Sequence, residues 1–303
     1  MQMKPWARWV GVGVLVLLAG ALALLWGAAQ WGDAKRDRHV DVPAHDLRLT
    51  ADAASLERGR YLFAVLGCGH CHGPDGAGRV FVDSPNGLKV KAPHISPGAG
   101  SVTAAYTPRD WERVLRHGAK PDGRPLLIMP CEDFAKLSDA DIAAIVVHTL
   151  SLPATQGTAA EFQLPLIVRA MLGLGVIPTA PEKIDHRAAH VAVAQAGTNV
   201  EHGRYIAQMC VGCHGPGFSG GRIPGAPPDW PPAANLTSGE GGVLGRYGQA
   251  EAFVAMLRSG RRPDGSAVSP VMPFESLKAI DEADARAIHA FLQTTPPKPA
   301  GQR

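Results

Sequence analysis

Four of the five cysteines in this sequence fall in two short runs of one pattern. The runs are Cys68-Gly69-His70-Cys71-His72 and Cys210-Val211-Gly212-Cys213-His214, each a C-x-x-C-H. Two thiols three positions apart on one helical turn can bond to both vinyl groups of a porphyrin, and the following histidine then reaches the iron. A single C-x-x-C could instead belong to a thioredoxin-like or zinc site, but two matching runs favour haem. We expect two covalently bound haems c, attached through Cys68, Cys71, Cys210 and Cys213, with His72 and His214 as proximal ligands.

Two methionines stand at matching distances behind these motifs. Met129 lies 57 residues after His72, Met272 lies 58 residues after His214, and a proline follows each methionine. A thioether sulfur is a soft ligand that favours ferrous iron, so His/Met coordination raises the reduction potential and fills the sixth position of the iron. We expect Met129 and Met272 to be the sixth ligands. Such closed sites suit outer-sphere electron transfer and bind oxygen or peroxide poorly, and we expect no catalytic residues.

The surroundings of the two motifs form an internal repeat that must position them. Gly59-Arg60-Tyr61 and Gly203-Arg204-Tyr205 precede the motifs, while Pro121-Asp122-Gly123 and Pro263-Asp264-Gly265 are matching turns ahead of the methionines. Each unit is expected to contain a helix, the C-x-x-C-H, a long loop, a second helix, a methionine loop and a closing helix. This is the order of elements in the cytochrome c fold.

The predicted fold class is all-α, because strand-like alternation is nowhere sustained. An N-terminal transmembrane helix is followed by two tandem cytochrome c domains. The predicted boundaries are 1–32 for the anchor, 50–153 for the first domain, 154–195 for a linker and 196–297 for the second domain. Three helix starts carry capping residues, each with an aspartate three positions further on. These expected N-caps are Thr107, Ser138 and Asp281.

The N-terminal segment has the length and composition of a membrane span. Residues from Val10 to Ala29 are apolar throughout, and about 20 residues at about 1.5 Å each cross a ~30 Å hydrocarbon core. Tryptophans lie at both ends of the run, as at lipid–water boundaries. A cleaved signal peptide is the alternative, with Gly27-Ala28-Ala29 at its end. The run is long for the apolar region of a signal peptide, so we expect a retained anchor in the cytoplasmic (inner) membrane. Haem c attachment takes place outside the bacterial cytoplasm, so we expect the haem domains in the periplasm.

Two other side chains and one segment have open roles. Cys131 has no thiol left to pair with, and we expect it to be a buried free thiol, with redox or ligand chemistry as the alternative. Arg116 and Arg258 match across the repeat and are expected at solvated helix ends, with a haem propionate as the alternative partner. The apolar stretch 162–177 is expected to pack across the two haem domains, and a surface for lipid or a partner subunit is the alternative.

The charge balance gives no sign of a nucleic-acid partner. The formal net charge is +3, and each ferric haem with two ionised propionates adds about −1, which leaves the loaded protein near neutral. The expected partners are therefore redox proteins and the membrane.

Several elements together resemble one repeat of a known family. They are Glu57-Arg58-Gly59-Arg60-Tyr61, the C-x-x-C-H, Pro93-His94-Ile95-Ser96, Trp111 with Arg116-His117-Gly118, and Asp122-Gly123 through Met129-Pro130. The chain resembles the membrane-bound cytochrome c subunits of periplasmic alcohol, aldehyde and gluconate dehydrogenases. That resemblance covers both units and implies electron transfer from a catalytic partner to quinone or a terminal oxidase. Those subunits usually carry three haems and a C-terminal anchor, whereas this chain has two motifs and an N-terminal apolar run.

The sequence therefore predicts a periplasm-facing dihaem cytochrome c. It would take electrons from a donor dehydrogenase or respiratory complex and pass them to a soluble cytochrome, an oxidase or a quinone pathway. Two alternatives stay open. One is a haem enzyme such as a thiosulfate dehydrogenase or a dihaem peroxidase, which needs an iron with an open position. The other is an integral cytochrome subunit of an oxidase complex.

Overall fold

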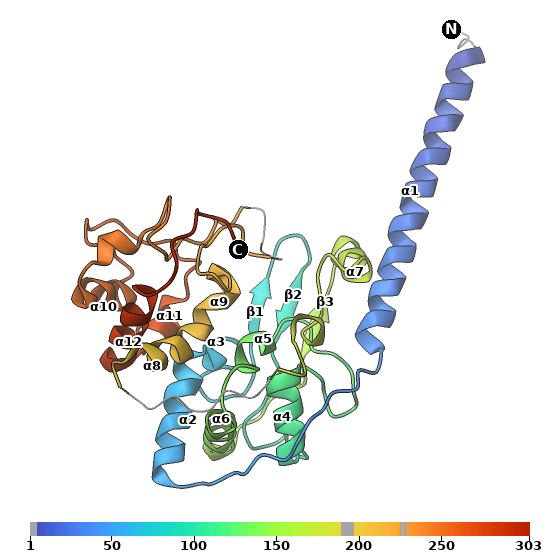
Figure 1. The fold of residues 1–303 in the computed structure, drawn as a ribbon. Coiled ribbons are helices and arrows are strands. Elements are labelled where there is room, and N and C mark those ends of the chain that lie inside the picture. Colours follow the sequence, from blue (N-terminus) through green and yellow to red (C-terminus); the bar gives the residue numbers. More distant parts are fainter. Residues whose placement is uncertain (1–4, 189–196, 225, 227–228) are drawn as a thin grey trace.

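Helix α1 (Pro5–Asp37) extends away from the rest of the molecule, which forms a body of two helical halves (Figure 1). This computed structural model describes residues 5–188, 197–224, 226 and 229–303. The first residues of the expected anchor and the expected boundary at 195/196 lie outside the described residues. The helix continues beyond the expected end at residue 32, because its last two turns are polar and pack against the body.

The two halves share the helices that the repeat predicts, in the same order, although the described part of the second half has two additional 3₁₀ helices. The first half has α2 (Ala53–Val65), α3 (Cys68–His72), α4 (Pro108–His117), α5 (Cys131–Phe134) and α6 (Asp139–Ser151). The second has α8 (Val200–Ile206), η2 (Ala207–Cys210), α9 (Val211–His214), η3 (Leu244–Tyr247), α10 (Ala250–Ser259), α11 (Phe274–Leu277) and α12 (Glu282–Leu292). In each half the first and last helices pack together, α2 on α6 and α8 on α12.

One glycine in each half explains how closely these helices approach. A Cβ on Gly59 would collide with the carbonyl oxygen of Ala144, and a Cβ on Gly203 would collide with that of Ala287. Any larger residue would push the closing helix away from the first helix. The Gly-Arg-Tyr signature of the repeat therefore begins at the crossing point of the two helices.

Two of the three expected helix caps form as predicted. Thr107 and Asp110 make a reciprocal capping box at the start of α4, and the Ser138 side chain accepts a hydrogen bond from the Asp141 backbone N–H at the start of α6. Asp281 holds the N-cap position of α12 without a side-chain capping bond. Its backbone N–H instead donates to the hydroxyl of Tyr61 in the other half, at 3.4 Å.

The all-α prediction needs a correction, because the structure contains a small sheet. Strands β1 (Val80–Asp83) and β2 (Lys89–Lys91) form a hairpin, and β3 (Glu161–Gln163) pairs antiparallel with β2. The hairpin turns at residues 84–88, where Gly87 has a φ of +85°. Strands of three or four residues are too short to show alternation in a sequence.

The apolar stretch after the first half also differs from its expected place. Helix α7 (Leu166–Gly173) does not pack across the two halves but lies along the end of α1 that is nearest the body (Figure 1). A short 3₁₀ helix, η1 (Pro181–Lys183), follows it.

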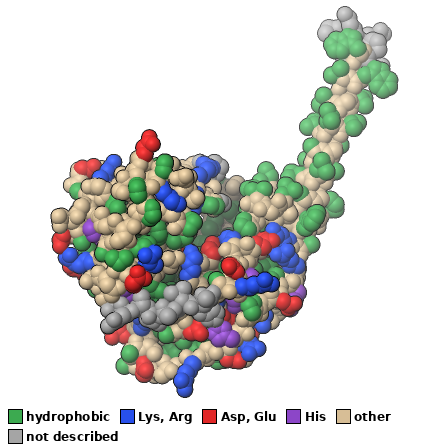
Figure 2. Space-filling view, viewed as in Figure 1, with side chains coloured by type: hydrophobic (Ala, Val, Ile, Leu, Met, Phe, Trp, Pro, Cys, Tyr) green, Lys and Arg blue, Asp and Glu red, His purple; other side chains and the backbone are tan. Residues whose placement is uncertain are grey.

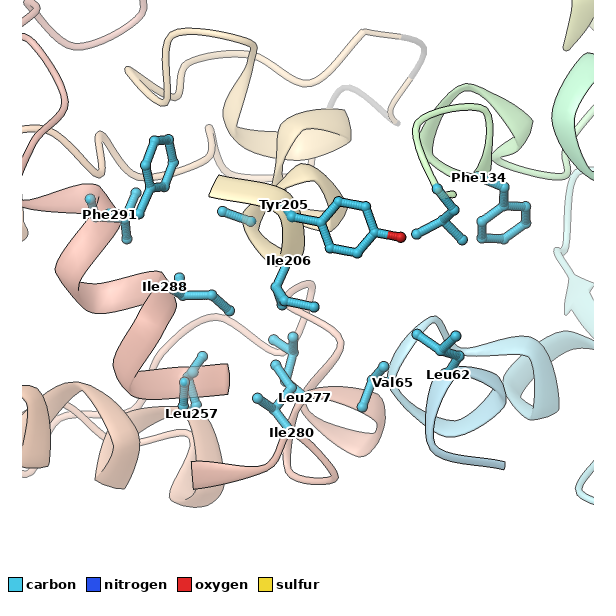
Figure 3. Packing of buried hydrophobic residues seen from close by; sticks show 14 of the residues in the cluster. Leu62, Val65, Phe134, Tyr205, Ile206, Leu257, Leu277, Ile280, Ile288 and Phe291 are labelled. Atoms are coloured by element: carbon cyan, nitrogen blue, oxygen red, sulfur yellow. The ribbon is translucent and has the colours of Figure 1, made fainter. Parts of the chain in front are cut away.

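The hydrophobic core is continuous between the two halves. One cluster of buried side chains includes Leu62 and Phe134 of the first half and Ile206 and Leu277 of the second. In Figure 3, Tyr205 points from α8 toward Phe134 of α5, and Val65 of α2 lies close to Leu277. The two halves therefore bury apolar surface against each other, which favours one fixed arrangement.

Candidate functional site

The two C-x-x-C-H runs form short helices with the same ending. After each one comes a glycine with positive φ, Gly73 at +83° and Gly215 at +77°. The four motif cysteines form no disulfide bond. Each motif thus presents two thiols on one helical turn, followed at once by its histidine.

Each of the two motif histidines is hydrogen-bonded to a backbone carbonyl about 20 residues further along the chain. The Nδ1 of His72 lies 2.9 Å from the carbonyl oxygen of Pro93, and the Nδ1 of His214 lies 2.8 Å from that of Ala234. A carbonyl only accepts, so Nδ1 carries the proton and Nε2 keeps its lone pair for a metal. Burial lowers the pKa of both histidines, which favours the neutral ring. Both residues therefore fit the proximal position of a haem iron.

The two methionines also occupy equivalent positions. In each case the methionine carbonyl accepts a hydrogen bond from the backbone N–H two residues later, Cys131 after Met129 and Phe274 after Met272, both at 2.8 Å. Both side chains are half-buried and pack against the core cluster. Coordination of iron by Met129 and Met272 stays a prediction that this symmetry supports.

Cys131 is a buried free thiol, as expected. Its side chain has no exposed surface, and its Sγ donates to the carbonyl oxygen of Val114 at 3.3 Å. Burial raises the pKa of this thiol, so the reactive thiolate is disfavoured. The structure gives no support to redox or ligand chemistry at this position.

The expectation for Arg116 is wrong, whereas that for Arg258 is confirmed. Arg116 is buried, with its Nε 3.1 Å from Glu112 and its Nη2 2.6 Å from Asp139. Arg258 has about half of its side chain exposed at its helix end. Glu112 stands one helical turn before Arg116, and this i,i+4 pair was the signal in the sequence for an internal ion pair.

Two tyrosines that join the halves were not recognised as functional in the sequence. Tyr205 of the second half donates to Asp141 of the first at 2.6 Å, and Tyr61 of the first half donates to Asp284 of the second at 2.5 Å. These tyrosines end the matching Gly-Arg-Tyr runs. The interface is therefore reciprocal, with each half giving one tyrosine and one aspartate.

Each aspartate is also held within its own half by the residue that precedes the glycine shared by the two repeats. Arg58 binds Asp141 through two bonds of 2.8 Å, from Nε and Nη2. His202, at the equivalent position, lies 2.6 Å from Asp284. The closing helices are thereby tied to the first helices of both halves at once.

The segments behind the methionines cross the same interface. Asp133 and Ser276 both stand four residues after a methionine. A Cβ on Gly212 would lie 3.0 Å from Asp133 Oδ2, and a Cβ on Gly67 would lie 3.0 Å from Ser276 Oγ. The methionine-loop helix of each half therefore packs beside the C-x-x-C-H of the other half.

The position of Asp133 is electrostatically unusual. Burial raises the pKa of its carboxyl to about 7, and the negative charge of Glu132 adds to the shift. Its Oδ1 is buried without a hydrogen-bond partner among the described residues. The carboxyl is therefore partly protonated at neutral pH, next to the second attachment motif.

Comparison with known proteins finds similarity to cytochrome c proteins. Residues 54–148 match the family described as cytochrome c oxidase, cbb3-type, subunit III. The chain is 30% identical over 283 residues to the cytochrome c subunit of a quinone alcohol dehydrogenase from Gluconobacter oxydans, which covers 83% of this chain and 57% of that protein. It is 26% identical over 276 residues to a fructose dehydrogenase cytochrome subunit from Gluconobacter japonicus, covering 84% and 56%.

A third relative is the gluconate 2-dehydrogenase cytochrome c subunit of Pantoea cypripedii, with 26% identity over 282 residues and coverage of 83% and 62%. The chain thus spans a little over half the length of these relatives. Their names are those of cytochrome c subunits, which confirms the resemblance inferred from the sequence.

Proposed function

We propose that this chain, a relative of the cytochrome c subunits of membrane dehydrogenases, is an electron-transfer subunit with two haems c. The observation that carries this proposal is the matched pair of motif histidines, His72 and His214, whose Nδ1 atoms are both held by a carbonyl while Nε2 stays available. A single histidine bonded to a carbonyl would not by itself indicate an iron ligand. Two, each directly after a C-x-x-C, point to two proximal ligands.

The proposed domains follow the repeat. The first cytochrome c domain is residues 50–153, the second is residues 196–297, and the linker lies between them. Neighbouring segments support both units: residues 155 and 157 bond to the backbone of residues 97 and 99, and residues 298–301 bond to the loop at 219–240. The segment that follows each unit therefore covers the long loop of that unit.

The residues of each site have separate tasks. The four motif cysteines would hold the porphyrins covalently, and His72 and His214 would be positioned by their carbonyl partners. Met129 and Met272 would close the sixth positions. When bound, haem iron supplies one-electron redox chemistry at a potential that the axial ligands set. With the sixth positions closed in this way, water and small ligands would be kept from the iron, which would favour electron transfer over catalysis.

The proposed location is the outer face of the cytoplasmic membrane. The segment Trp9–Asp37 has a mean hydropathy of 2.4 over its most apolar window, and none of that window is buried in the structure. An unburied apolar helix of this length suits a retained anchor, and a signal sequence has the same features. The haem units would then lie in the periplasm beside a donor dehydrogenase.

The test is the haem content and ligand state of the full chain purified from membranes. We expect two haems c for each chain, electron uptake from the dehydrogenase that copurifies with it, and little carbon monoxide binding in the reduced state. Replacing both Cys210 and Cys213 by Ala should leave one haem. A single haem in the unmodified protein, or strong carbon monoxide binding at either site, would overturn the proposal of two closed sites.

A further inference from the structure

Helix α7 packs against the anchor helix α1, and the segments on either side of it are attached to the first half: β3 pairs with β2, and the Ala180 N–H donates to the carbonyl oxygen of Leu126. A Cβ on Gly32 of α1 would collide with the carbonyl oxygen of Arg169, and a Cβ on Gly173 would collide with that of Ala28. Small residues on both helices thus allow backbone contact, as in packed membrane helices. Arg169 also pairs with Asp33 through two bonds.

The contact with α7 lies at one end of the apolar run of α1. The run ends at Ala29, and the contacts fall at Ala28, Gly32 and Asp33, which is within about one helical turn of that end. Trp26 and Trp31 flank this level and are exposed by 61% and 71%. If α1 spans a bilayer, α7 lies where hydrocarbon meets headgroups.

The outer face of α7 and of the loop after it is apolar. Among the described residues outside α1, eight large hydrophobic side chains are exposed, and four of them fall between residues 166 and 176. Ile167 is 61% exposed, Leu174 70% and Val176 59%. Figure 2 shows hydrophobic side chains covering α1 along its length, so this face adjoins a larger apolar surface.

Charged residues follow directly beyond the level of this apolar face. Lys35, Arg36 and Arg38 follow the apolar run, and Glu182 pairs with Lys35 at 2.8 Å and with Arg38 at 2.9 Å. Basic side chains just beyond a span lie at the level of lipid phosphates. The apolar side chains of residues 166–176 would therefore lie at the level of the hydrocarbon, and the basic side chains after the span would lie at the level of the headgroups.

We propose that residues 166–176 form a second membrane contact, a lipid-embedded helix and loop beside the N-terminal span. This inference rests on the anchor role proposed for α1. A single span leaves a protein free to tilt and rotate about its tether. A second contact, held against the span by close backbone packing at Gly32 and Gly173 and by the Arg169–Asp33 pair, fixes which side of the haem units faces the bilayer.

The experiment places an environment-sensitive fluorophore at single new cysteines in the full haem-loaded chain. Ile167→Cys and Leu174→Cys report on the proposed contact, and Ala140→Cys, exposed at the start of α6, is the matched control. Cys131 is buried and should not react. The labelled proteins are reconstituted in nanodiscs of phosphatidylethanolamine and phosphatidylglycerol, and quenching by iodide is compared with quenching by nitroxide-labelled lipid.

We expect lipid quenching to be severalfold stronger at residues 167 and 174 than at residue 140, and iodide quenching to be severalfold weaker. In the Ile167→Glu, Leu174→Glu double variant, a label at Val176→Cys should lose its lipid quenching while the chain stays in the disc. Iodide quenching at 167 and 174 equal to that at 140 would overturn the inference. Protection from both quenchers would also overturn it, in favour of a protein partner. If the unmodified chain does not stay in the disc, the anchor role proposed for α1 is refuted.

Discussion

Loss of the Tyr205 hydroxyl should weaken the contact between the two halves. Tyr205 is 5% exposed and donates to the Asp141 carboxylate at 2.6 Å, while it accepts from the Ser138 backbone N–H at 3.0 Å. In Tyr205→Phe the ring still fills its place, but a buried donor and a buried charge each lose a partner. A charge-assisted bond contributes about 1.5–3 kcal/mol, and the orphaned N–H adds to this, so we expect a loss of about 2–3 kcal/mol.

The equivalent change on the other side gives an internal comparison. Tyr61 donates to Asp284 at 2.5 Å, but it is half-buried and its second contact, from the Asp281 N–H, is 3.4 Å long. We expect Tyr61→Phe to cost about 1–2 kcal/mol, less than Tyr205→Phe. Tyr106→Phe is the control, because that ring packs edge-on against Trp111 within the first half, with centroids 5.5 Å apart.

The assay is urea unfolding of the haem-loaded protein, followed by far-ultraviolet circular dichroism and by haem absorbance. The two-state treatment applies to the unmodified protein only if both signals change together. Weaker docking should lower the midpoint and separate the unfolding of the two halves. If Tyr205→Phe costs less than about 0.5 kcal/mol, or no more than Tyr106→Phe, the interface is not held in the way described.

Three further predictions concern single side chains. Met129→Ala or Met272→Ala should each abolish the ferric methionine–iron absorption band of one haem and lower its reduction potential; an unchanged spectrum would exclude that methionine as a ligand. The raised pKa of Asp133, about 7 against an ordinary 3.8, means that the folded state binds more protons than the unfolded state between about pH 4 and pH 7. The contribution of this carboxyl to the free energy of unfolding therefore falls as pH rises through that window. Asp133→Asn should be more stable than the unmodified protein at pH 8, by on the order of 1–3 kcal/mol, and close to it at pH 4. Equal pH dependence of the two proteins in urea titrations would contradict this. Cys131→Ser should leave both haem spectra intact, and loss of either band would show that the thiol acts at a haem.

The repeat made the helical order and the positions of both histidines predictable from the sequence. A C-x-x-C-H is a local pattern, so its geometry depends on few distant residues. The caps at Thr107 and Ser138 are equally local and were predicted correctly. The carbonyl partners of His72 and His214 lie 21 and 20 residues away, and although Pro93 begins a motif that the sequence shows, nothing in the sequence indicates that its carbonyl bonds to His72.

Contacts between the halves could not be predicted in the same way. The tyrosine of a Gly-Arg-Tyr run has the same sequence surroundings whether it packs in its own unit or in the other. Only the spatial arrangement decides that Tyr61 and Tyr205 exchange partners. Asp281 failed as a side-chain cap beside this contact. The short strands at 80–83 and 89–91 were not predicted, because they form a hairpin whose second strand also pairs with residues 161–163, far along the chain.

The packing of each methionine-loop helix beside the C-x-x-C-H of the other half couples the two halves. A Cβ on Gly212 would lie 3.0 Å from Asp133 Oδ2, and a Cβ on Gly67, the residue before the first motif, would lie 3.0 Å from Ser276 Oγ. A substitution at Asp133 or Ser276 should therefore change the surroundings of the C-x-x-C-H in the other half, so the two proposed haem sites would not be independent of each other.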